Sequence, residues 1–542
     1  MIPLVSFLKW ILNERFLFGF CTLLAAVAGL FSAERQWQMF QQNSYFPSRY
    51  LSWLKEKKNL HGVIGRVVFL LCLFVLDIGN NHAALLIFTG LLLLYLIVSV
   101  IRALRSRRKS VKKLVFTARI KRTYAALIGL YGLLILLQVA VLKSSGYWFL
   151  SAAVFLSVLP QAAVFLLYAL LYPVERAITR RYIRDAKRIL QSYNGRLKVV
   201  GITGSYGKTG TKFILSSILK EKYNVVATPQ SFNTPMGVVR TIREQLRPET
   251  EIFLCEMGAK RTGDIREICD IVSPDLGIIT SVGPQHLDTF HDLHNVLNTK
   301  FELYDAVCKK GGKTYACGDN ESIRSRSIRD DVVLYGSEEG FPFRIGEVAC
   351  SKEGQSFTLW LRGESVRLST RLLGDHDREN IAGAAALAFD LGVSPERIRM
   401  AVARLAPVPH RLEMKRFTAG SILIDDAYNA NPVGCLDACR VLARFSDMKR
   451  VIVTPGLVEL GEKEYEYNYN LGLAAAGAAD VIILVGKERS KPLSSAVLAA
   501  GFAKENLYVV SSFAEAMQIY TPMAGPDTVV LFENDLPDNY LK

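Results

Sequence analysis

The chain has 542 residues and a mass of 60.4 kDa, too long for one hydrophobic core, and its length predicts about three or four compact units. Its formal net charge of +16 would suggest a nucleic-acid partner if the charge were spread evenly. However, residues 1–198 hold 27 Lys and Arg against 6 Asp and Glu, a net +21, whereas the remainder holds 39 against 44, a net −5. The basic charge therefore belongs to the first third, and no nucleic-acid partner is predicted.

Five apolar segments predict a multi-span helical membrane region over residues 1–190. Most of them approach the roughly 20 residues that cross a bilayer, and the first is also compatible with a helix lying at the interface. The segments are residues 16–33, 63–76, 83–101, 124–142 and 147–172.

The basic residues between these segments predict an orientation. Segments 34–60, 102–122 and 173–198 carry five, ten and eight Lys or Arg, whereas the turns between them carry almost none. Because Lys and Arg concentrate on the cytoplasmic side, we expect a multi-pass protein of the cytoplasmic membrane with everything after Pro173 in the cytoplasm. The run "RSRRKSVKK" is expected to attract anionic headgroups, which makes membrane lipid an expected partner.

A glycine-rich loop follows the first third. The apolar stretch "LKVVGIT" predicts a buried strand, and "KFILSSIL" predicts a helix with one apolar face. Backbone N–H groups of such a loop cradle phosphates, while Lys208 can reach the β and γ oxygens and the Thr209 hydroxyl can ligate Mg²⁺. The strict spacing of a phosphate loop is not met, because Ile202 stands at the first glycine position. The predicted nucleotide contacts are Thr203, Gly204, Ser205, Tyr206, Gly207, Lys208 and Thr209.

This form of the loop resembles the Mur ligase family, ATP-dependent enzymes that join an amino acid or peptide to a carboxylate in building cell-wall peptides. The resemblance covers about residues 195 to 535. It implies an ATP-binding domain with a parallel sheet over residues 191–406 and a smaller Rossmann-like domain over residues 407–542. In the latter, five short apolar stretches predict strands that alternate with helices, and ATP is expected between the two domains.

Three further segments match the family's metal site. "FLCEMGA" places Glu256 at the end of a strand, like the family glutamate that ligates Mg²⁺. "SVGPQHLDTF" places His286 like the ligand of a second Mg²⁺, although Ser281 stands where the family has Asn. "NVLNTKFELY" matches the segment whose lysine is carbamylated, which is Lys300. The resemblance implies two Mg²⁺ held by Thr209, Glu256, His286 and carbamylated Lys300.

Two further segments supply residues expected to contact the adenine and the γ-phosphate of ATP. "GDHDREN" retains Gly374, His376 and Asn380 of a family motif, with Asp377 in place of Asn, and the Asn380 amide can pair with the adenine edge. "PHRLE" supplies Arg411, which the resemblance implies reaches the γ-phosphate. The expected catalytic residues are Lys208, His286, Lys300 and Arg411.

The segment "DDAYNANP" closely resembles a signature of the branch that adds D-alanyl-D-alanine to a UDP-N-acetylmuramoyl tripeptide. The resemblance implies that Asp426 faces the ribose and that Tyr428 and Asn429 shape the loop over ATP. Asn431 is expected to contact substrate, together with Asn233 and Thr234 of "SFNTPMGV".

Two positions and one C-terminal stretch depart from that branch. Thr234 stands where a second Asn is usual, and Asn468 stands where the branch has His. The ending "LFENDLPDNY" replaces a Lys-Gly-Ser-Arg stretch. These departures leave the acceptor and the amine open.

The resemblance implies a membrane-anchored ligase that activates a carboxylate by γ-phosphoryl transfer, after which an amine attacks the acyl phosphate to give an amide, ADP and phosphate. We expect ATP and Mg²⁺ as cofactors, and a role in peptidoglycan synthesis. Because apolar segments take the place of the family's UDP-binding domain, the acceptor is either UDP-linked or lipid-linked. The alternatives are a ligase that extends a polyamino acid such as poly-γ-glutamate at the membrane, and a transporter or sensor gated by the ATPase.

Overall fold

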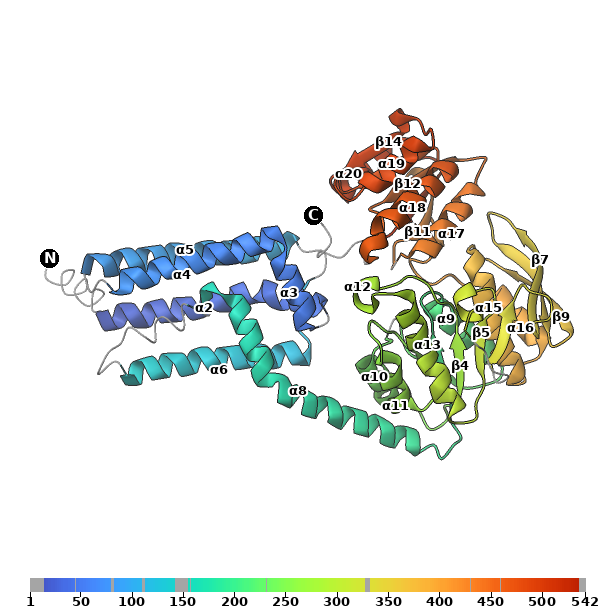
Figure 1. The fold of residues 1–542 in the computed structure, drawn as a ribbon, viewed down its shortest axis with the longest axis horizontal. Coiled ribbons are helices and arrows are strands. Elements are labelled where there is room, and N and C mark those ends of the chain that lie inside the picture. Colours follow the sequence, from blue (N-terminus) through green and yellow to red (C-terminus); the bar gives the residue numbers. More distant parts are fainter. Residues whose placement is uncertain are drawn as a thin grey trace. The chain divides into compact units, whose positions relative to one another are not determined.

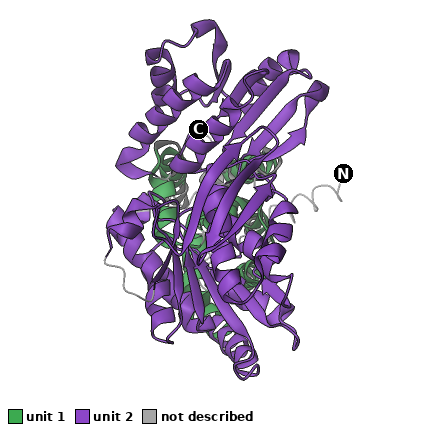
Figure 2. Ribbon diagram, turned by 90° about the vertical axis from the view of Figure 1, so that its right-hand side faces the viewer, with its two compact units in different colours: residues 1–178, 536–542 green, residues 179–535 purple. Residues whose placement is uncertain are grey.

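The computed structural model divides the chain into two units, Met1–Ile178 with Leu536–Lys542, and Thr179–Asp535 (Figures 1 and 2). The residues that the structure describes are 14–43, 45–78, 82–109, 113–141, 155, 157–230, 232–326, 332–428, 430–458 and 460–535.

The first unit is helical. Its helices are α2 (Glu14–Gln42), α3 (Pro47–Lys55), α4 (Lys57–Ile78), α5 (His82–Lys109), α6 (Ala118–Val141) and the first part of α8 (Pro160–Gln191). Its core is rich in aromatic side chains: the buried ring of Phe40 contacts Tyr50 and Tyr168, each with centroids 5.4 Å away. The guanidinium of Arg122 makes two hydrogen bonds to the Glu175 carboxylate and so ties α6 to α8.

The prediction of a five-span, multi-pass membrane protein is wrong. Within the described residues, one helix, Pro160–Gln191, is long and apolar enough to cross a membrane. The predicted segments were counted by hydropathy, which does not separate a spanning helix from one that packs against its neighbours. Ala25, Leu92 and Leu127, from three of those segments, are fully buried inside the unit. Part of the fifth segment, residues 147–154, lies outside the described residues.

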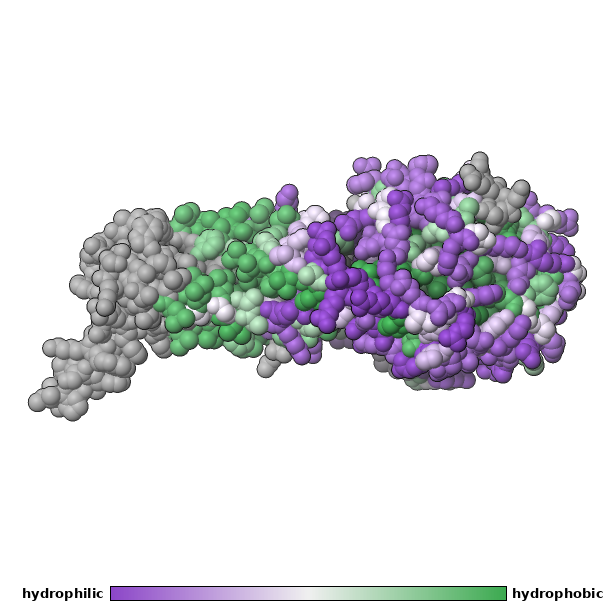
Figure 3. All heavy atoms as spheres, turned by 90° about the horizontal axis from the view of Figure 1, so that it is seen from below, coloured by the Kyte–Doolittle hydropathy of each residue, from purple (hydrophilic) through white to green (hydrophobic). Residues whose placement is uncertain are grey.

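Large exposed apolar side chains are nevertheless frequent on the first unit. Leu71, Leu94 and Leu136 are among the most exposed of them. In Figure 3, apolar side chains gather on this unit, whereas hydrophilic side chains dominate the visible face of the second. Contiguous exposed apolar surface is typical of regions that contact other molecules.

The second unit contains a nine-stranded sheet with the order β2-β3-β1-β4-β5-β6-β7-β8-β9. Strands β1 to β6 pair in parallel, and β7, β8 and β9 form an antiparallel extension. The strands are β1 (Lys198–Thr203), β2 (Val225–Ala227), β3 (Ile252–Glu256), β4 (Leu276–Ile279), β5 (Thr314–Cys317), β6 (Val332–Gly336), β7 (Phe343–Cys350), β8 (Gln355–Leu361) and β9 (Glu364–Thr370). The accompanying helices are α9 (Lys208–Leu219), α10 (Pro235–Gln245), α11 (Asp264–Val272), α12 (Leu287–Phe290), α13 (Leu293–Cys308), α14 (Glu321–Arg324), α15 (Asp375–Asp390) and α16 (Pro395–Ala403).

A second, six-stranded sheet has the order β10-β11-β15-β12-β13-β14. All five strands predicted for this region are present and parallel, and β10 adds an antiparallel edge strand. The strands are β10 (Glu413–Arg416), β11 (Ile422–Asp426), β12 (Lys449–Thr454), β13 (Val481–Val485), β14 (Leu507–Val510) and β15 (Thr528–Glu533). The helices are α17 (Pro432–Ala443), α18 (Glu464–Ala478), α19 (Lys491–Ala499) and α20 (Phe513–Tyr520). The α/β class predicted for this part of the chain is therefore confirmed.

The strand order of the first sheet positions the site. From β1 the chain builds β2 and β3 on one side and β4, β5 and β6 on the other, so the order reverses at β1. Ligands of open parallel sheets bind outside the carboxyl ends of the strands at such a reversal. The loops that follow β1, β3 and β4 meet there.

Candidate active site

Two glycines give the loop after β1 its shape. Gly204 has a φ of 152°, and a Cβ there would lie 2.1 Å from Thr280 Oγ1. Gly207 has a φ of 79°, and its Cβ would lie 2.4 Å from Asn380 Oδ1. Neither position accepts a side chain without movement of its neighbours. The loop therefore passes close to α15 and β4 and delivers the chain to α9, whose first backbone N–H groups suit a phosphate.

Hydrogen bonds fix the loop to the segment after β4. The Ser205 N–H donates to Ser281 O at 2.7 Å, and the Tyr206 hydroxyl donates to Pro284 O at 2.6 Å. Ser281, which stands where the family has Asn, also accepts the Tyr206 N–H through Oγ at 3.1 Å. At the start of the loop, the Thr203 hydroxyl donates to the carbonyl of Met257, the residue directly after β3, at 3.0 Å.

Lys208 opens α9 and folds back over the loop. Its Nζ donates to Gly204 O at 2.7 Å and to Ser205 O at 2.9 Å. Burial lowers the pKa of Lys208 to about 8, with Glu256 opposing that shift and Arg411 adding to it. Because these carbonyl partners are weak compared with a phosphate, the ammonium is poised for an anionic ligand.

Glu256, at the end of β3, is the centre of a buried polar cluster. Its Oε1 accepts hydrogen bonds from Thr209 Oγ1 and Asn233 Nδ2, both at 3.0 Å. Its Oε2 pairs with Lys212 Nζ at 2.9 Å. The predicted metal ligand is therefore in contact with the predicted Thr209 ligand and with the predicted substrate residue Asn233. Mg²⁺ prefers oxygen ligands, so the Thr209 hydroxyl and the Glu256 carboxylate fit this ion.

Lys212 was not predicted to be part of the site. It lies one helical turn after Lys208 on α9, and its side chain is fully buried. The i,i+4 spacing of the two lysines at the start of a helix is the signal that could have identified it.

His286 and Lys300 lie on the elements that follow β4. His286 is half-buried at the N-cap of α12, with a left-handed φ of 53°. Lys300 is buried on α13, where burial holds its pKa well below the usual range, the nearby Lys208 adding to this effect and Asp264 and Glu302 opposing it. Mg²⁺ prefers oxygen ligands and an unmodified lysine offers only a nitrogen, so Lys300 fits the predicted metal role only in its carbamylated form.

Asn380 lies behind the loop. Its Oδ1 accepts a hydrogen bond from the Thr211 hydroxyl at 2.9 Å and lies next to Gly207. Its Nδ2 is buried and has no hydrogen-bond partner among the described residues. Asn380 thus supports the loop, and its pairing with adenine stays a prediction.

The second domain contributes Arg411, Asp426 and Tyr428. The Arg411 guanidinium lies 5.5 Å from the Tyr428 ring centroid. Asp426 Oδ1 accepts the Leu412 N–H at 3.1 Å, and burial raises the pKa of Asp426 to about 6 against the opposing charges of His376 and Arg411. Asn429 lies outside the described residues.

Two predicted substrate residues cap helices. Asn431 Oδ1 accepts the Gly434 N–H at 2.9 Å at the start of α17, and Thr234 Oγ1 accepts the Gly237 N–H at 3.4 Å at the start of α10. Asn468, which replaces a histidine of the branch, is also structural: it is buried and makes hydrogen bonds to both backbone groups of Leu457. Capping accounts for the residue types at Asn431 and Thr234, so their contact with substrate stays a prediction.

An ion-pair network joins the start of α15 to α17, and the sequence had not revealed it. His376 Nδ1 lies 2.6 Å from Asp437 Oδ2, and Arg440 and Arg444 bind the Asp375 carboxylate, each at 3.0 Å. Burial would lower the pKa of His376, but the carboxylates of Asp377 and Asp437 raise it to about 10. The two domains are therefore fastened beside the predicted ATP site.

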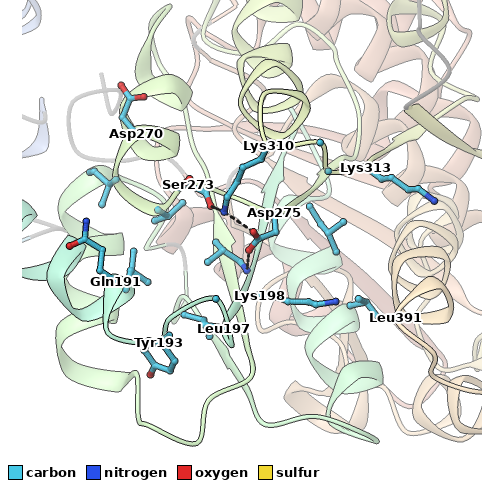
Figure 4. Close-up of a pocket in the computed structure, with 18 of the residues that line it drawn as sticks. Gln191, Tyr193, Leu197, Lys198, Asp270, Ser273, Asp275, Lys310, Lys313 and Leu391 are labelled. Atoms are coloured by element: carbon cyan, nitrogen blue, oxygen red, sulfur yellow. Dashed lines mark hydrogen bonds and ion pairs between the residues drawn. The ribbon is translucent and has the colours of Figure 1, made fainter.

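A cavity of about 720 Å³ lies at the amino ends of β1 and β4, whereas the predicted ATP site lies at the carboxyl ends of the strands (Figure 4). In it, Lys310 Nζ donates to Ser273 O at the end of α11 and pairs with Asp275, whose other oxygen accepts the Val199 N–H. Lys310 thus neutralises a helix C-terminus. None of the predicted site residues lines this cavity.

Two family models match the chain: the Mur ligase middle domain over residues 202–388 and the Mur ligase, glutamate ligase domain over residues 410–533. UDP-N-acetylmuramoyl-tripeptide–D-alanyl-D-alanine ligases are among its relatives. The ligase of Mycobacterium tuberculosis H37Rv is 33% identical over 245 residues, 44% of this chain and 47% of that protein. The ligase of Bacillus subtilis 168 is 30% identical over 281 residues, 52% of this chain and 60% of that protein. The chain thus spans about half the length of these curated relatives.

Solved structures of MurF ligases are also similar to this chain. The MurF ligase of Thermotoga maritima in complex with ADP is 26% identical, with a TM-score of 0.58 over 66% of this chain and 80% of that chain. MurF from Acinetobacter baumannii is 25% identical, with a TM-score of 0.58 over 67% of this chain and 78% of that chain. With two family domains in tandem and a matching fold, the chain belongs to the Mur ligase family.

Proposed function

We propose that this protein is an ATP-dependent amide ligase that activates a carboxylate as an acyl phosphate for attack by an amine, and that it acts in peptidoglycan synthesis. The observation that carries the proposal is the contact between the phosphate loop and the buried Glu256: Lys208 and Thr209 begin α9, and Thr209 binds the Glu256 carboxylate at 3.0 Å. The related D-alanyl-D-alanine ligases support this choice of reaction.

The loop would bind the triphosphate through the first N–H groups of α9 and through Lys208. Thr209 and Glu256 would hold one Mg²⁺, and His286 with carbamylated Lys300 would hold a second. When bound, the cations offset the negative charge of the triphosphate and the incoming carboxylate. Lys208, released from the carbonyls of Gly204 and Ser205, would follow the charge on the γ-phosphate.

The reaction has two steps. An acceptor carboxylate oxygen attacks the γ-phosphorus and ADP leaves; the amine nitrogen then attacks the acyl carbon, phosphate leaves and the nitrogen loses a proton. Asn233, fixed beside Glu256, would orient the acceptor. Arg411 would reach the γ-phosphate from the second domain, and a closed arrangement of the two domains, 191–406 and 407–542, would keep water from the acyl phosphate.

The acceptor and the amine can be tested together. The full chain is incubated with ATP, Mg²⁺, UDP-N-acetylmuramoyl tripeptide or other peptidyl carboxylates, and D-alanyl-D-alanine or other amines. We expect ADP and a new amide mass in equal amounts, abolished in Lys208→Ala and retained in Lys220→Ala, a change of an exposed lysine at the end of α9. ADP formation without an amide, or an amide yield that Lys208→Ala leaves intact, would overturn the proposal.

A further inference from the structure

Lys212 is a fully buried cation with two partners on different segments. Its Nζ pairs with Glu256 Oε2 at 2.9 Å and donates to the backbone carbonyl of Gln230. An ammonium in such a place is costly unless it is paired and hydrogen-bonded, and both conditions are met here. The side chain therefore links α9, the end of β3 and the segment after β2.

The segment after β2 consists of residues 228–230 and 232–234, and we refer to it as the acceptor segment. One end is attached to β3, because the Thr228 N–H donates to Leu254 O at 3.0 Å and its hydroxyl accepts the Glu256 N–H at 3.1 Å. The other end is attached through Asn233, whose Nδ2 binds Glu256 Oε1 and whose carbonyl accepts the Gly258 N–H at 2.8 Å.

The middle of the acceptor segment is bonded to Lys212. Gln230 has a φ of 44°, in the left-handed region that residues other than glycine rarely adopt. A conformation of this kind persists only where its surroundings hold it, and the Lys212 ammonium supplies such a hold through the Gln230 carbonyl.

We propose that Lys212 is a positioning residue that joins the acceptor segment to the Glu256 carboxylate and thereby sets the affinity for the acceptor. The inference rests on the proposed function, because it takes Asn233 as the residue that meets the acceptor. Asn233 and Lys212 bind opposite oxygens of Glu256, so the orientation of that carboxylate, and of the amide bound to it, depends on the Lys212 ammonium.

This role differs from that of Lys208. Within the described part of the chain, the Lys208 ammonium donates hydrogen bonds to the carbonyls of Gly204 and Ser205 in the loop, and it can exchange them for a phosphate. The Lys212 ammonium lies behind Glu256 with no exposed surface. Loss of Lys212 should therefore loosen the acceptor segment and leave the phosphate contacts of the loop in place.

The test compares Lys212→Met with Lys220→Met in the full chain. Hydrogen exchange followed by mass spectrometry reports the acceptor segment, steady-state kinetics report the KM for the acceptor, and calorimetry with EDTA reports ADP binding without metal. For Lys212→Met we expect exchange of the acceptor segment to rise about tenfold or more and the acceptor KM to rise about tenfold or more, from the loss of one charged hydrogen-bond donor. ADP affinity should stay within about twofold, and Lys220→Met should resemble the unchanged protein.

Two outcomes overturn the inference: an acceptor segment whose exchange is unchanged, or faster exchange with an unchanged acceptor KM. If Lys212→Met does not fold, Lys212→Gln, which retains an N–H donor, should give the same changes at smaller size. Failure of the unchanged protein to form any amide would instead overturn the proposed function, since the exchange measurement does not depend on turnover.

Discussion

Replacing Gly207 by alanine tests the geometry of the loop. The backbone there has a φ of 79°, which costs an alanine about 1–2 kcal/mol. The new Cβ would lie 2.4 Å from Asn380 Oδ1, and Asn380 is buried and bonded to Thr211, so it has little room to yield. Overpacking of this kind adds about 1–3 kcal/mol. We expect a total local cost of about 2–5 kcal/mol.

Hydrogen exchange at the first turn of α9 is the appropriate assay, because a chain of several domains does not unfold in one step. The Thr211 N–H, which donates to Gly207 O at 2.8 Å, should lose protection by about thirtyfold or more, since each 1.4 kcal/mol is a factor of ten. Gly210→Ala is the matched control: its Cβ would lie 3.3 Å from Asn380 Nδ2, and alanine favours the helix. Equal protection in Gly207→Ala and the unchanged protein would refute the reasoning.

Two further predictions concern the second domain. Asn468→Ala should destabilise it by about 2–3 kcal/mol, because both backbone groups of Leu457 lose a buried partner, whereas Asn470→Ala on the exposed face of α18 should not; hydrogen exchange at the Leu457 N–H measures both. Asp437→Asn should weaken the contact between α15 and α17. The pKa of His376 is raised to about 10, so the stability that its positive charge contributes is fully present below pH 6.5 and is lost as the pH rises through 10. The pKa of Asp437 is lowered to about 2, so the stability that its negative charge contributes is fully present above pH 3.8 and is lost as the pH falls through 2. The stability difference between Asp437→Asn and the unchanged protein should therefore be larger at pH 6 than at pH 10, and a difference independent of pH would contradict this pairing.

Local sequence patterns sufficed to predict the part of the site that lies in one continuous segment. The strand, the glycines and Lys208 are contiguous, so the loop was predictable from local sequence. Glu256 and Asn233 were predicted because their segments resemble those of the Mur ligase family. The structure joins Thr209 of the loop and Asn233 to Glu256 by hydrogen bonds, at the carboxyl ends of strands in a sheet whose order reverses at β1.

Contacts between distant segments were not predictable in the same way. Lys212 was read as part of an amphipathic helix, and only the fold places it between Glu256 and Gln230. The network around Asp437 joins residues about sixty positions apart. Strand β10, with the sequence "EMKR", is a partly exposed edge strand without an apolar run, so hydropathy did not reveal it.

The apolar first third shows the limit of counting hydrophobic runs. Where the structure describes them, the runs form helices, but their hydropathy does not say whether a side chain meets another helix. Leu92 and Leu127 are buried among neighbours, whereas Leu94 and Leu136 are exposed on the same helices. The prediction of spans treated these two kinds of position alike.

Calorimetric titration of the full chain with ADP is the most direct test of a phosphate site at the start of α9. We predict binding by the unchanged protein and a loss of about 10- to 150-fold in affinity in Lys208→Ala, the effect of one charged hydrogen bond to a phosphate. Equal affinities in the two proteins would contradict the assignment of the loop.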